Sequence, residues 1–549
     1  MAPREEKFKT DANDDQRYLV WASLAIILIA TAVIRIRLLD IPLERDEGEY
    51  AYAGQLILQG IPPYAQAYNM KLPGIYAAYA FIIAIFGQTH TAIHLGLLII
   101  NAATIAMVFL LTRRLFDSFA AIAAAAAFAM LSMGQMVLGV SANAEHFVIL
   151  PAIAGIFLLL IAIDSRRYRH LFAAGLLLGL CFLMKQHGAM FMAFAAIYWF
   201  VTEIRAKPLA LKPLLLKGLT LGAGLILPFA ITCLILWQAG VFEKFWFWTF
   251  EYASEYASAV PLSRGLRNLG HTLPAILSSA PLPWILSGIG LGALAFSEKY
   301  RRRIGFGLGL LVFSLLAICP GFYFREHYFI LLLPVVALLA GLGTSFIFSL
   351  LTRHRSAKTK IAVATVIAAS VTLHTIAKQK PFFFEYDPYR LARTSYGVNP
   401  FPESIEIARY IEQNSEPTDT IAVMGSEPQI YFYSKRRAAT AYLYTYALME
   451  THQYAPKMQR EMIGQIGRAK PKFLISVRIS HSWLNRPESD ESIFHWLREF
   501  TRVHYEMTGV IDISVDRPTV YVWGESSRAH RPQSPAFIEV YELKEDVEN

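Results

Sequence analysis

The residues most capable of chemistry lie in one stretch, ERDEGEYAYAGQLILQGIPPYAQAYNMKLPGIY, which occupies residues 44–76 and follows the first apolar run. It contains closely spaced carboxylates and a single lysine: Asp46, Glu47, Glu49 and Lys71. A positioned carboxylate can accept or orient the proton of a hydroxyl group, and a lysine can neutralise the charge on a leaving phosphate. Because ionisable groups beside a bilayer are costly and usually purposeful, we interpret the stretch as an active-site loop.

Asp46 also has a purely structural interpretation. Helical spacing of apolar residues from Tyr50 to Leu58 predicts a short helix that ends at the Gly-Ile-Pro-Pro sequence of residues 60–63. Asp46 would be its N-cap, and Glu49 would complete a capping box that needs no chemistry. One residue can both cap and catalyse, so both interpretations stay open.

Other titratable residues are predicted to lie at the same face of the membrane. They are Glu145, His146, Lys185, His187, Arg325 and His327. Together with the loop they combine carboxylates with cations, which suits a reaction between a lipid phosphate leaving group and a hydroxyl acceptor. Arg325 could clamp phosphate oxygens through two N–H groups, whereas Lys71 would act as a point charge.

Each of these residues also has a simpler interpretation. Glu145 and His146 open an apolar run and could merely cap its helix. Lys185 could extend from a helix end to the lipid headgroups. Arg325 could form an ordinary interfacial ion pair with the glutamate that follows it.

The composition indicates the class of protein to which these residues belong. Of the 549 residues, 55% are hydrophobic and only 17% are charged, which excludes an ordinary soluble protein. The net charge of +9 comes from short basic clusters between apolar runs rather than from one basic face, so we expect no nucleic-acid partner. Cys181, Cys233 and Cys319 lie in apolar runs without metal-ligand spacing and are predicted to be packing residues.

Apolar runs of roughly 20 residues are long enough to cross a bilayer, and shorter paired runs extend the count to about eleven spans. The expected spans are residues 18–39, 91–112, 118–140, 145–163, 171–184, 188–202, 213–238, 270–296, 304–320, 327–351 and 361–377. Residues 72–86 are too few for a clear span and suit a helix in the interface. If they do not cross, the basic clusters share the N-terminal side, which the positive-inside rule places in the cytoplasm. The C-terminus would then lie outside.

Two further regions are predicted to lie on the outer side. The aromatic segment around Phe245, Trp246, Trp248 and Tyr252 indicates an interfacial helix with its rings at headgroup level. Residues 381–549 are polar and alternate predicted strands with helices, which indicates a soluble α/β domain. The predicted strands are TIAVMG, KFLISV, YVWG and FIEVYEL, and the predicted helices are FPESIEIARYIEQN and ESIFHWLREF.

The predicted organisation is thus a polytopic α-helical membrane domain, residues 1–380 with its first outer loop at 40–90, followed by the soluble domain. The turn at residues 425–428 of the soluble domain follows a strand. Such a turn is more often a connection than a ligand-binding loop, and both interpretations stay open.

Three sequences in the chain resemble a known family. DEGEYAYAGQLILQG followed by NMKLPGIY resembles the first outer loop of bacterial polyprenyl-phosphate-sugar-dependent glycosyltransferases of the GT-C fold, of the family 39 type. That family is related to protein O-mannosyltransferases and to lipid A aminoarabinose transferases. GLCFLMKQHG at residues 179–188 and FREHYFILLLP at residues 324–334 are similar to later segments of the family. The resemblance covers residues 1 to about 380.

The resemblance implies roles for particular residues. Asp46 would be the acceptor-activating carboxylate, Glu47 would support it, and Lys71 would contact the donor phosphate. Weaker matches imply donor-binding roles for Lys185, Arg325 and His327, and leave Glu49, Glu145, His146 and His187 as further candidates. The single proline in NMKLPG departs from the Lys-Pro-Pro of many relatives. Metal use differs within the fold and the chain offers no reliable ligand motif, so a divalent metal cofactor stays an open question.

The first functional hypothesis is a membrane glycosyltransferase that moves a sugar from a polyprenyl-phosphate donor to a lipid, polysaccharide or protein acceptor outside the cytoplasmic membrane. A transporter or flippase of a lipid-linked sugar is the alternative from another class. It is disfavoured because the polar residues gather at one membrane face instead of the midplane. A third hypothesis is a non-catalytic subunit of envelope assembly that presents the outer domain.

Overall fold

The computed structural model describes residues 3–206, 210–352, 370 and 373–544, with side chains from residue 18 onward. Its contacts divide the chain into two compact units, each assembled from three segments. We call the first the helical unit; it comprises Met1–Leu39, His94–Thr232 and Ala257–Glu385. The second, the mixed unit, comprises Asp40–Ile93, Cys233–Tyr256 and Tyr386–Asn549. The first outer loop is therefore part of the same unit as the C-terminal region.

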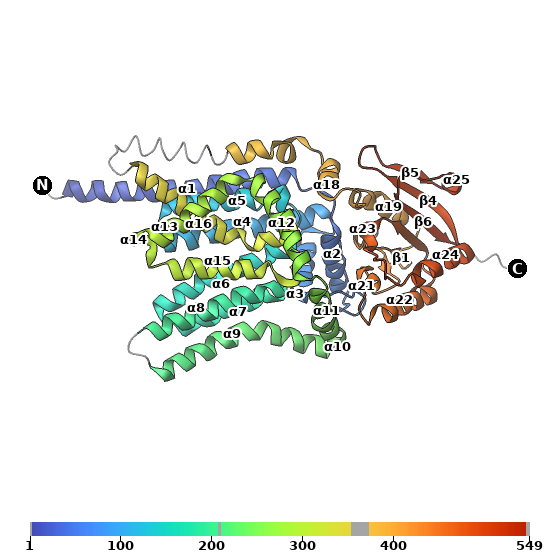
Figure 1. The fold of residues 1–549 in the computed structure, drawn as a ribbon, viewed down its shortest axis with the longest axis horizontal. Helices are drawn as coiled ribbons and strands as arrows, with labels where there is room; N and C mark the ends of the chain where they lie inside the picture. The colour runs from blue at the N-terminus through green and yellow to red at the C-terminus, as the bar shows by residue number, and fades with distance from the viewer. Residues whose placement is uncertain (1–2, 207–209, 353–369, 371–372, 545–549) are drawn as a thin grey trace. The chain divides into compact units, whose positions relative to one another are not determined.

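The helical unit is a bundle of apolar helices with short connections (Figure 1). Its longer helices are α1 Pro3–Arg37, α4 His90–Leu115, α5 Ser118–Leu131, α6 Ala144–Ser165, α7 Tyr168–Met184, α8 Ala189–Arg205, α9 Leu211–Gln238, α12 Leu262–Ser279, α13 Pro281–Phe296, α15 Ile304–Ala317 and α16 Leu333–Thr352. Short helical pieces are η1 Gln135–Val137, η2 Gln186–Gly188, α14 Glu298–Arg301, η4 Pro320–Phe322, η5 Glu326–Leu331 and η6 Pro381–Glu385.

Six of the described helices are long and apolar enough to cross a membrane, and the bent pair α12 and α13 would make a seventh. Four further apolar helices are shorter: α3 Pro73–Phe86, α5, α7 and α15. Every span predicted between residues 18 and 351 contains at least one of these helices, so the helical membrane part is confirmed. Residues 361–369 and 371–372 of the last expected span lie outside the described residues.

Small residues allow the helices of the bundle to pack closely. A Cβ on Gly290 of α13 would lie 1.9 Å from the carbonyl oxygen of Leu339 in α16. A Cβ on Gly341 of α16 would lie 2.3 Å from the carbonyl oxygen of Ala120, in the alanine-rich helix α5. Without a hydrophobic force between helices in lipid, such close backbone contacts supply much of the packing energy.

Two predicted spans differ from the structure. The helix predicted at 118–140 ends at Leu131, because the chain beyond it folds around the buried guanidinium of Arg35. That guanidinium donates 3.1 Å hydrogen bonds to the carbonyl oxygens of Ser132 and Gly139, which a continuous helix would have used internally. The span predicted at 270–296 is two helices bent by 100°, with Pro281 starting the second.

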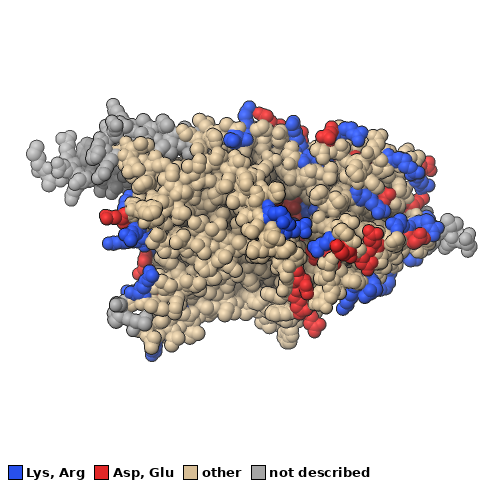
Figure 2. All heavy atoms as spheres, in the orientation of Figure 1, with Lys and Arg blue, Asp and Glu red and all other residues tan. Residues whose placement is uncertain are grey.

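The exposed surface of the helical unit is suited to lipid. Figure 2 shows a broad band without charge over the helices, with charged residues gathered at its edge. Large apolar side chains of α9, such as Leu215, Leu219 and Ile226, are each more than 60% exposed. Apolar exposure on this scale would be a liability in water, so it indicates contact with acyl chains.

The mixed unit combines the first outer loop with the C-terminal region. The loop forms two packed helices, α2 Arg45–Leu58 and α3, and the C-terminal helices include α18 Pro388–Tyr396, α19 Phe401–Gln413, α20 Gln429–Ser434, α21 Tyr446–Met449, α22 Ala455–Ala469, α23 Ser480–Trp483, α24 Ser492–His504 and α25 Glu525–Ala529. The strands are β1 Thr420–Met424, β2 Arg437–Ala438, β3 Phe473–Arg478, β4 Tyr505–Ile513, β5 Val520–Trp523 and β6 Ala536–Leu543.

The six strands form one mixed sheet in the order β2-β1-β3-β6-β4-β5. Strand β1 runs parallel to β2 and β3, whereas β6 pairs antiparallel with β3 and β4. The buried strands read as apolar runs, as β3 does with FLISVR. All four predicted strands and both predicted helices of this region are present, so the predicted α/β character is confirmed.

The aromatic segment is helical but does not present its rings as predicted. Phe245, Trp248 and Tyr252 are at most 5% exposed, and Trp248 stacks on Tyr68 of the first outer loop. The prediction that these rings lie at headgroup level is therefore wrong for three of the four, since they bury their area within the mixed unit. Trp246 alone keeps 43% exposure. The segment comprises α10 Phe242–Trp246, the π-helix η3 Phe247–Tyr252 and α11 Ala253–Ser258.

Candidate active site

The start of α2 determines which of its carboxylates remain available. Glu44 is the N-cap: its side chain accepts from the Glu47 backbone N–H, and the Glu47 side chain accepts from the Glu44 N–H, both at 3.1 Å. The capping box thus begins two residues earlier than predicted, and the capping interpretation of Asp46 and Glu49 is wrong. Glu47 is occupied in the cap, while Asp46 in the first turn is not needed there.

Asp46 is the centre of a polar cluster in the mixed unit. Lys71 Nζ lies 3.0 Å from Asp46 Oδ2, and the Tyr444 hydroxyl donates to Asp46 Oδ1 at 2.6 Å. Lys71 also donates to the Tyr50 hydroxyl at 3.2 Å. The Asp46 and Lys71 side chains are 13% and 14% exposed, so the ion pair is shielded but still reachable.

Lys71 is held in place through its own backbone. The Tyr64 hydroxyl donates to the Lys71 carbonyl oxygen at 2.7 Å. Tyr64 is fully buried and has a positive φ of 66°, a backbone conformation that a bulky residue adopts only when its surroundings enforce it. Its ring packs on Phe245 of the aromatic segment with centroids 5.4 Å apart. The aromatic segment therefore stabilises the position of Lys71 indirectly, through Tyr64.

Glu49 differs from Asp46 in burial and in protonation state. It is fully buried, and the Tyr76 hydroxyl donates to its Oε1 at 2.5 Å. Burial raises the pKa of Glu49 to about 8, although the nearby Lys71 charge acts in the opposite direction. At neutral pH Glu49 is thus mostly protonated, and Asp46 is the carboxylate that forms the ion pair with Lys71.

The C-terminal region anchors α2 at a second point. Arg45 donates to the carbonyl oxygen of Ser426, pairs with Glu427 at 2.5 Å and donates to Asn399 Oδ1 at 3.0 Å. Glu427 is fully buried, so this pair is a fixed structural contact. The turn at residues 425–428, which follows strand β1, therefore engages α2 directly, and this contact favours its structural interpretation.

Tyr444 is the residue of this cluster that sequence reasoning missed. It lies between β2 and α21, in the aromatic sequence AYLYTYALME, 398 residues after Asp46. The density of tyrosines there was the available signal. Nothing in a single sequence pairs one of those tyrosines with a carboxylate so far away.

A second polar cluster lies in the helical unit. Lys185 at the end of α7 pairs with Glu145 in the first turn of α6, and both side chains are at most 6% exposed. His327 Nε2 lies 3.9 Å from the same Glu145 oxygen, Oε1. The ring of Tyr328 lies 4.3 Å from the Lys185 ammonium and packs edge-on against His187. The snorkelling interpretation of Lys185 is therefore wrong, because its ammonium is buried against a carboxylate.

The remaining candidates also lie in the helical unit. His187 contacts the Ala317 carbonyl oxygen at 2.7 Å through Nδ1, and His146 is buried in the α6 turn that contains Glu145. Arg325 precedes η5 and lies over the Tyr323 ring at 5.5 Å.

The predicted site residues thus form two groups. Asp46, Glu47, Glu49 and Lys71 come together in the mixed unit, whereas the other candidates belong to the helical unit. Among the described residues, no group of three His, Cys, Asp or Glu side chains is placed to hold a metal ion.

Comparison with known proteins assigns the chain to a class. Residues 71–232 match the family described as dolichyl-phosphate-mannose-protein mannosyltransferase. No curated protein sequence matches the chain. Its fold is similar to that of ArnT from Cupriavidus metallidurans bound to undecaprenyl phosphate, with a TM-score of 0.60 at 14% identity over 94% of this chain and 97% of that one.

A second similar structure is the archaeal oligosaccharyltransferase AglB from Archaeoglobus fulgidus in complex with an inhibitory peptide and a dolichol-phosphate. The TM-score is 0.52 at 14% identity, over 93% of this chain and 75% of that one. The family match over residues 71–232 and the shared fold support a multi-pass membrane glycosyltransferase of the GT-C fold, related to protein mannosyltransferases and similar in fold to ArnT. The resemblance noted in the sequence is confirmed.

Proposed function

We propose that the protein transfers a sugar from a polyprenyl-phosphate-linked donor to a hydroxyl-bearing acceptor at the outer face of the cytoplasmic membrane. The observation that carries the proposal is the contact of Asp46 with Lys71, a carboxylate and a cation 3.0 Å apart in a shielded site. The family match begins at Lys71 itself. The printed ligands of the similar structures, undecaprenyl phosphate and a dolichol-phosphate, are of the proposed donor class.

The reaction exchanges one bond at the anomeric carbon of the sugar. The bond from that carbon to the phosphate oxygen breaks, and its electron pair leaves with the polyprenyl phosphate. A bond from the same carbon to the acceptor oxygen forms, and the acceptor hydroxyl proton passes to the Asp46 carboxylate. Asp46 acts as general base, and Lys71 stabilises the charge that develops on the departing phosphate.

Lys71 has to change partner in this scheme. In the described structure its ammonium is paired with Asp46, which holds the carboxylate back from the acceptor. A donor phosphate competes for the same ammonium, so donor binding draws Lys71 away and releases Asp46 for proton transfer. Tyr444 keeps Asp46 oriented during the exchange, because its hydrogen bond goes to the other oxygen, Oδ1.

The remaining candidates receive supporting roles. Glu47 fixes the start of α2 through the capping box and so supports Asp46. Lys185, Arg325 and His327 stay proposed donor-binding residues, and two of them, Lys185 and His327, converge on Glu145 within the helical unit. The Glu145 oxygen Oε2 has no hydrogen-bond partner among the described residues, which leaves the cluster an acceptor atom for a ligand hydroxyl.

The proposal includes an orientation in the membrane. The N-terminus lies in the cytoplasm, and residues 381–549 form a domain on the outer side. The observation that supports it is the distribution of basic residues, such as Arg113, Arg114, Arg166 and Arg167, at helix ends distant from the Glu145 end of the bundle.

The proposed function is tested by mass spectrometry of envelope lipids, polysaccharides and proteins from cells with and without the protein. We expect one modification of hexose or pentose mass to be lost without it and restored by the wild-type chain. An unchanged envelope, with the lipid-linked sugar accumulating on one membrane face, would instead support the flippase hypothesis.

A further inference from the structure

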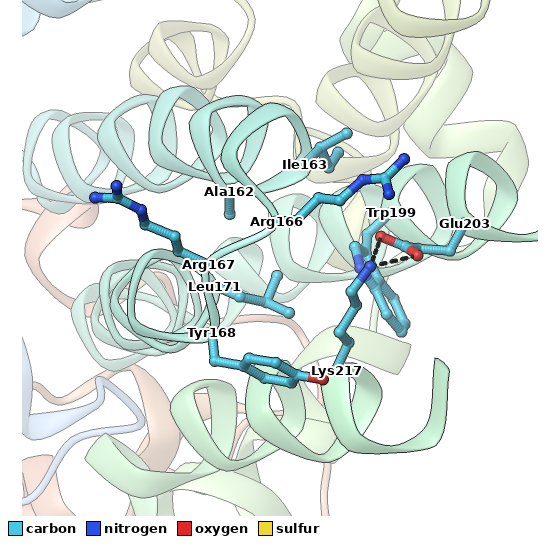
Figure 3. A pocket seen from close by; sticks show the side chains of 9 residues that line it. All are labelled: Ala162, Ile163, Arg166, Arg167, Tyr168, Leu171, Trp199, Glu203 and Lys217. Atoms are coloured by element: carbon cyan, nitrogen blue, oxygen red, sulfur yellow. Dashed lines mark hydrogen bonds and ion pairs between the residues drawn. The ribbon is translucent and has the colours of Figure 1, made fainter. Parts of the chain in front are cut away.

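The shielded ion pairs Lys217–Glu203 and Arg45–Glu427 both join separate elements, but they differ in what lies beside them. Lys217 Nζ lies 2.8 Å from both carboxylate oxygens of Glu203 and holds α9 to α8 (Figure 3). The hollow beside this pair has room for about one water molecule, so it offers no space for a larger ligand. Arg45 instead begins α2, and its partner Glu427 belongs to the turn at residues 425–428.

Ser426, in the same turn, uses all of its polar groups within the mixed unit, where it is fully buried. Its backbone N–H donates to Ser482 Oγ at 2.8 Å, and its carbonyl oxygen accepts from Arg45 Nε. Its Oγ accepts from the backbone N–H of Thr445 at 2.9 Å. The Thr445 hydroxyl, 3.1 Å from Ser426 Oγ, donates to the Ser482 carbonyl oxygen, so the Ser426 hydroxyl proton goes to Thr445 Oγ1. Ser426 thus joins the start of α2 to the residue that precedes α21.

These contacts close a ring around the hydrogen bond between Tyr444 and Asp46. Arg45 directly precedes Asp46 in the chain, and Thr445 directly follows Tyr444. Ser426 hydrogen-bonds to both of these neighbours, and the Tyr444 hydroxyl completes the ring by donating to Asp46 Oδ1 at 2.6 Å. An isolated tyrosine and aspartate would each lose conformational freedom on pairing. Because the residue beside each is already fixed, the hydroxyl and the carboxylate meet at little further entropic cost.

Two glycines allow the elements of this ring to approach each other. A Cβ on Gly425 would lie 2.6 Å from Ser482 Oγ and 2.8 Å from Val477 Cβ, so a side chain there would push the turn away from β3 and α23. A Cβ on Gly48 of α2 would lie 2.6 Å from the backbone nitrogen of Gln429, the first residue of α20. The start of α2 is therefore packed closely against the helix that follows the turn.

We propose that Ser426 is a positioning residue for sugar transfer. By fixing Arg45 through its carbonyl oxygen and Thr445 through its hydroxyl, it holds the Tyr444 hydroxyl on Asp46. The inference rests on the proposed function, since Asp46 is the general base of that reaction. Burial and the Asp46 charge raise the pKa of Tyr444 well above its usual range, so the hydroxyl keeps its proton and remains a donor.

A double-mutant cycle tests this role, with initial rates of transfer from a polyprenyl-phosphate sugar by the full-length protein. Ser426→Ala should lower kcat about fivefold to tenfold, the equivalent of one hydrogen bond, with little change in donor KM. The acidic limb of its pH–rate profile should move to higher pH, because a carboxylate that loses a hydrogen-bond donor is protonated more easily. In the Tyr444→Phe background, Ser426→Ala should lower kcat by at most about twofold, since the hydroxyl through which it acts is gone.

The matched control is Ser434→Ala. Ser434 is a fully buried serine of α20, and its hydroxyl donates to the Tyr431 carbonyl oxygen at 3.4 Å instead of joining the ring. Its removal should leave the pH–rate profile where it is in the wild type. An equal displacement of the profile in Ser434→Ala and Ser426→Ala would overturn the proposal.

A second variant opens the ring at its other link and serves if Ser426→Ala does not fold. Arg45→Lys keeps a positive charge for Glu427 but lacks the fork of donors that also reaches the Ser426 carbonyl oxygen. We expect kcat to fall in Arg45→Lys and to fall no further when this change is added to Tyr444→Phe. Equal losses in both backgrounds, from either Arg45→Lys or Ser426→Ala, would overturn the proposal.

A measurement without transfer separates this inference from the proposed function. With 3-fluorotyrosine in place of Tyr444, fluorine NMR of the full-length protein reports the surroundings of the hydroxyl. In Ser426→Ala the resonance should move toward its position in Asp46→Ala, where the hydroxyl has lost its acceptor, and in Ser434→Ala it should stay. An unmoved resonance in Ser426→Ala would overturn the proposal. Absence of transfer by the wild type would instead refute the proposed function, and the resonance would still decide whether Ser426 holds the hydroxyl in place.

Discussion

The hydroxyl of Tyr444 donates a 2.6 Å hydrogen bond to Asp46 Oδ1, which joins the C-terminal region to the first outer loop across 398 residues of sequence. Lys71 occupies the other oxygen of the same carboxylate at 3.0 Å. Each oxygen of the Asp46 carboxylate thus has its own partner. The neutral Tyr444 hydroxyl can keep its hydrogen bond during the reaction, whereas the phosphate of the sugar donor can attract the Lys71 ammonium away. The predictions below test this arrangement.

Removal of the Tyr444 hydroxyl should slow transfer without loss of donor binding. In Tyr444→Phe we expect kcat to fall roughly tenfold to hundredfold, the value of a hydrogen bond to a charged group, with little change in KM for the donor. The acidic limb of the pH–rate profile should move to higher pH, because the lost hydrogen bond favoured the charged carboxylate. Tyr446→Phe is the control, since its hydroxyl donates to the His481 carbonyl oxygen instead. Equal profiles for both variants would show that Tyr444 has no part in positioning.

Loss of the Lys71 charge should affect the donor directly. Lys71→Gln should lower kcat/KM for the donor roughly a hundredfold, as is typical for removal of a group that stabilises developing negative charge. Lys71→Arg should restore part of the activity, since the charge remains but the point-charge geometry does not. Lys244→Gln serves as control, because Lys244 in the same unit donates to the Tyr68 hydroxyl and forms no ion pair with any residue that the structure describes. A normal donor KM in Lys71→Gln would place the phosphate elsewhere.

Glu49 should make stability depend on pH. Its pKa of about 8 in the folded protein lies above the ordinary value of 4.5, so between these values the folded chain binds more protons than the unfolded chain. Stability therefore decreases as pH rises through this window, and the penalty is complete above pH 8. Glu49→Gln should flatten the pH dependence of stability. At alkaline pH it should raise the free energy of unfolding by at most about 5 kcal/mol, and Tm should rise with it.

Thermal unfolding in detergent across this pH range measures the effect. Glu412→Gln is the matched control, since Glu412 is exposed and pairs with Lys435 at the surface. If the Tm values of Glu49→Gln and Glu412→Gln both depend on pH as that of the wild type does, Glu49 does not carry the proton assigned to it.

The Glu145–Lys185 pair should show the asymmetry of a buried ion pair. Glu145→Gln leaves the Lys185 ammonium buried without its partner and should cost about 3–5 kcal/mol of stability. The double variant Glu145→Gln/Lys185→Met should recover much of that loss, because no charge is then left unpaired. Transfer activity should not recover in the double variant. Recovery of both stability and transfer activity in the double variant would show that the Glu145–Lys185 pair has only a structural role.

Much of the architecture could be predicted from the sequence, because its signals are local. Long apolar runs located the helices, and short continuous apolar runs located buried strands such as β3. The errors have physical causes that are not local. The helix predicted through residue 140 stops at Leu131 because the buried Arg35, on another helix, needs the carbonyl oxygens beyond it.

The residues of the candidate site also fall into those that the sequence predicts and those that only the folded chain reveals. Asp46 and Lys71 could be predicted because several carboxylates and a lysine lie close together in the sequence beside apolar runs. Tyr444 could not be found, since only the folded chain brings it to Asp46. The capping box was misplaced because Glu44 and Glu47 satisfy the same spacing rule as Asp46 and Glu49, and the pattern alone does not choose between them.

The most direct test is the initial rate of sugar transfer from a purified polyprenyl-phosphate sugar by Asp46→Asn in the full-length protein. Asparagine keeps an oxygen for the Tyr444 hydroxyl and removes only the charge and the ability to take a proton. We expect the rate to fall at least about a hundredfold, with the Tm of the variant close to that of the wild type. Transfer at a near-normal rate by a folded Asp46→Asn protein would contradict the central claim that Asp46 activates the acceptor.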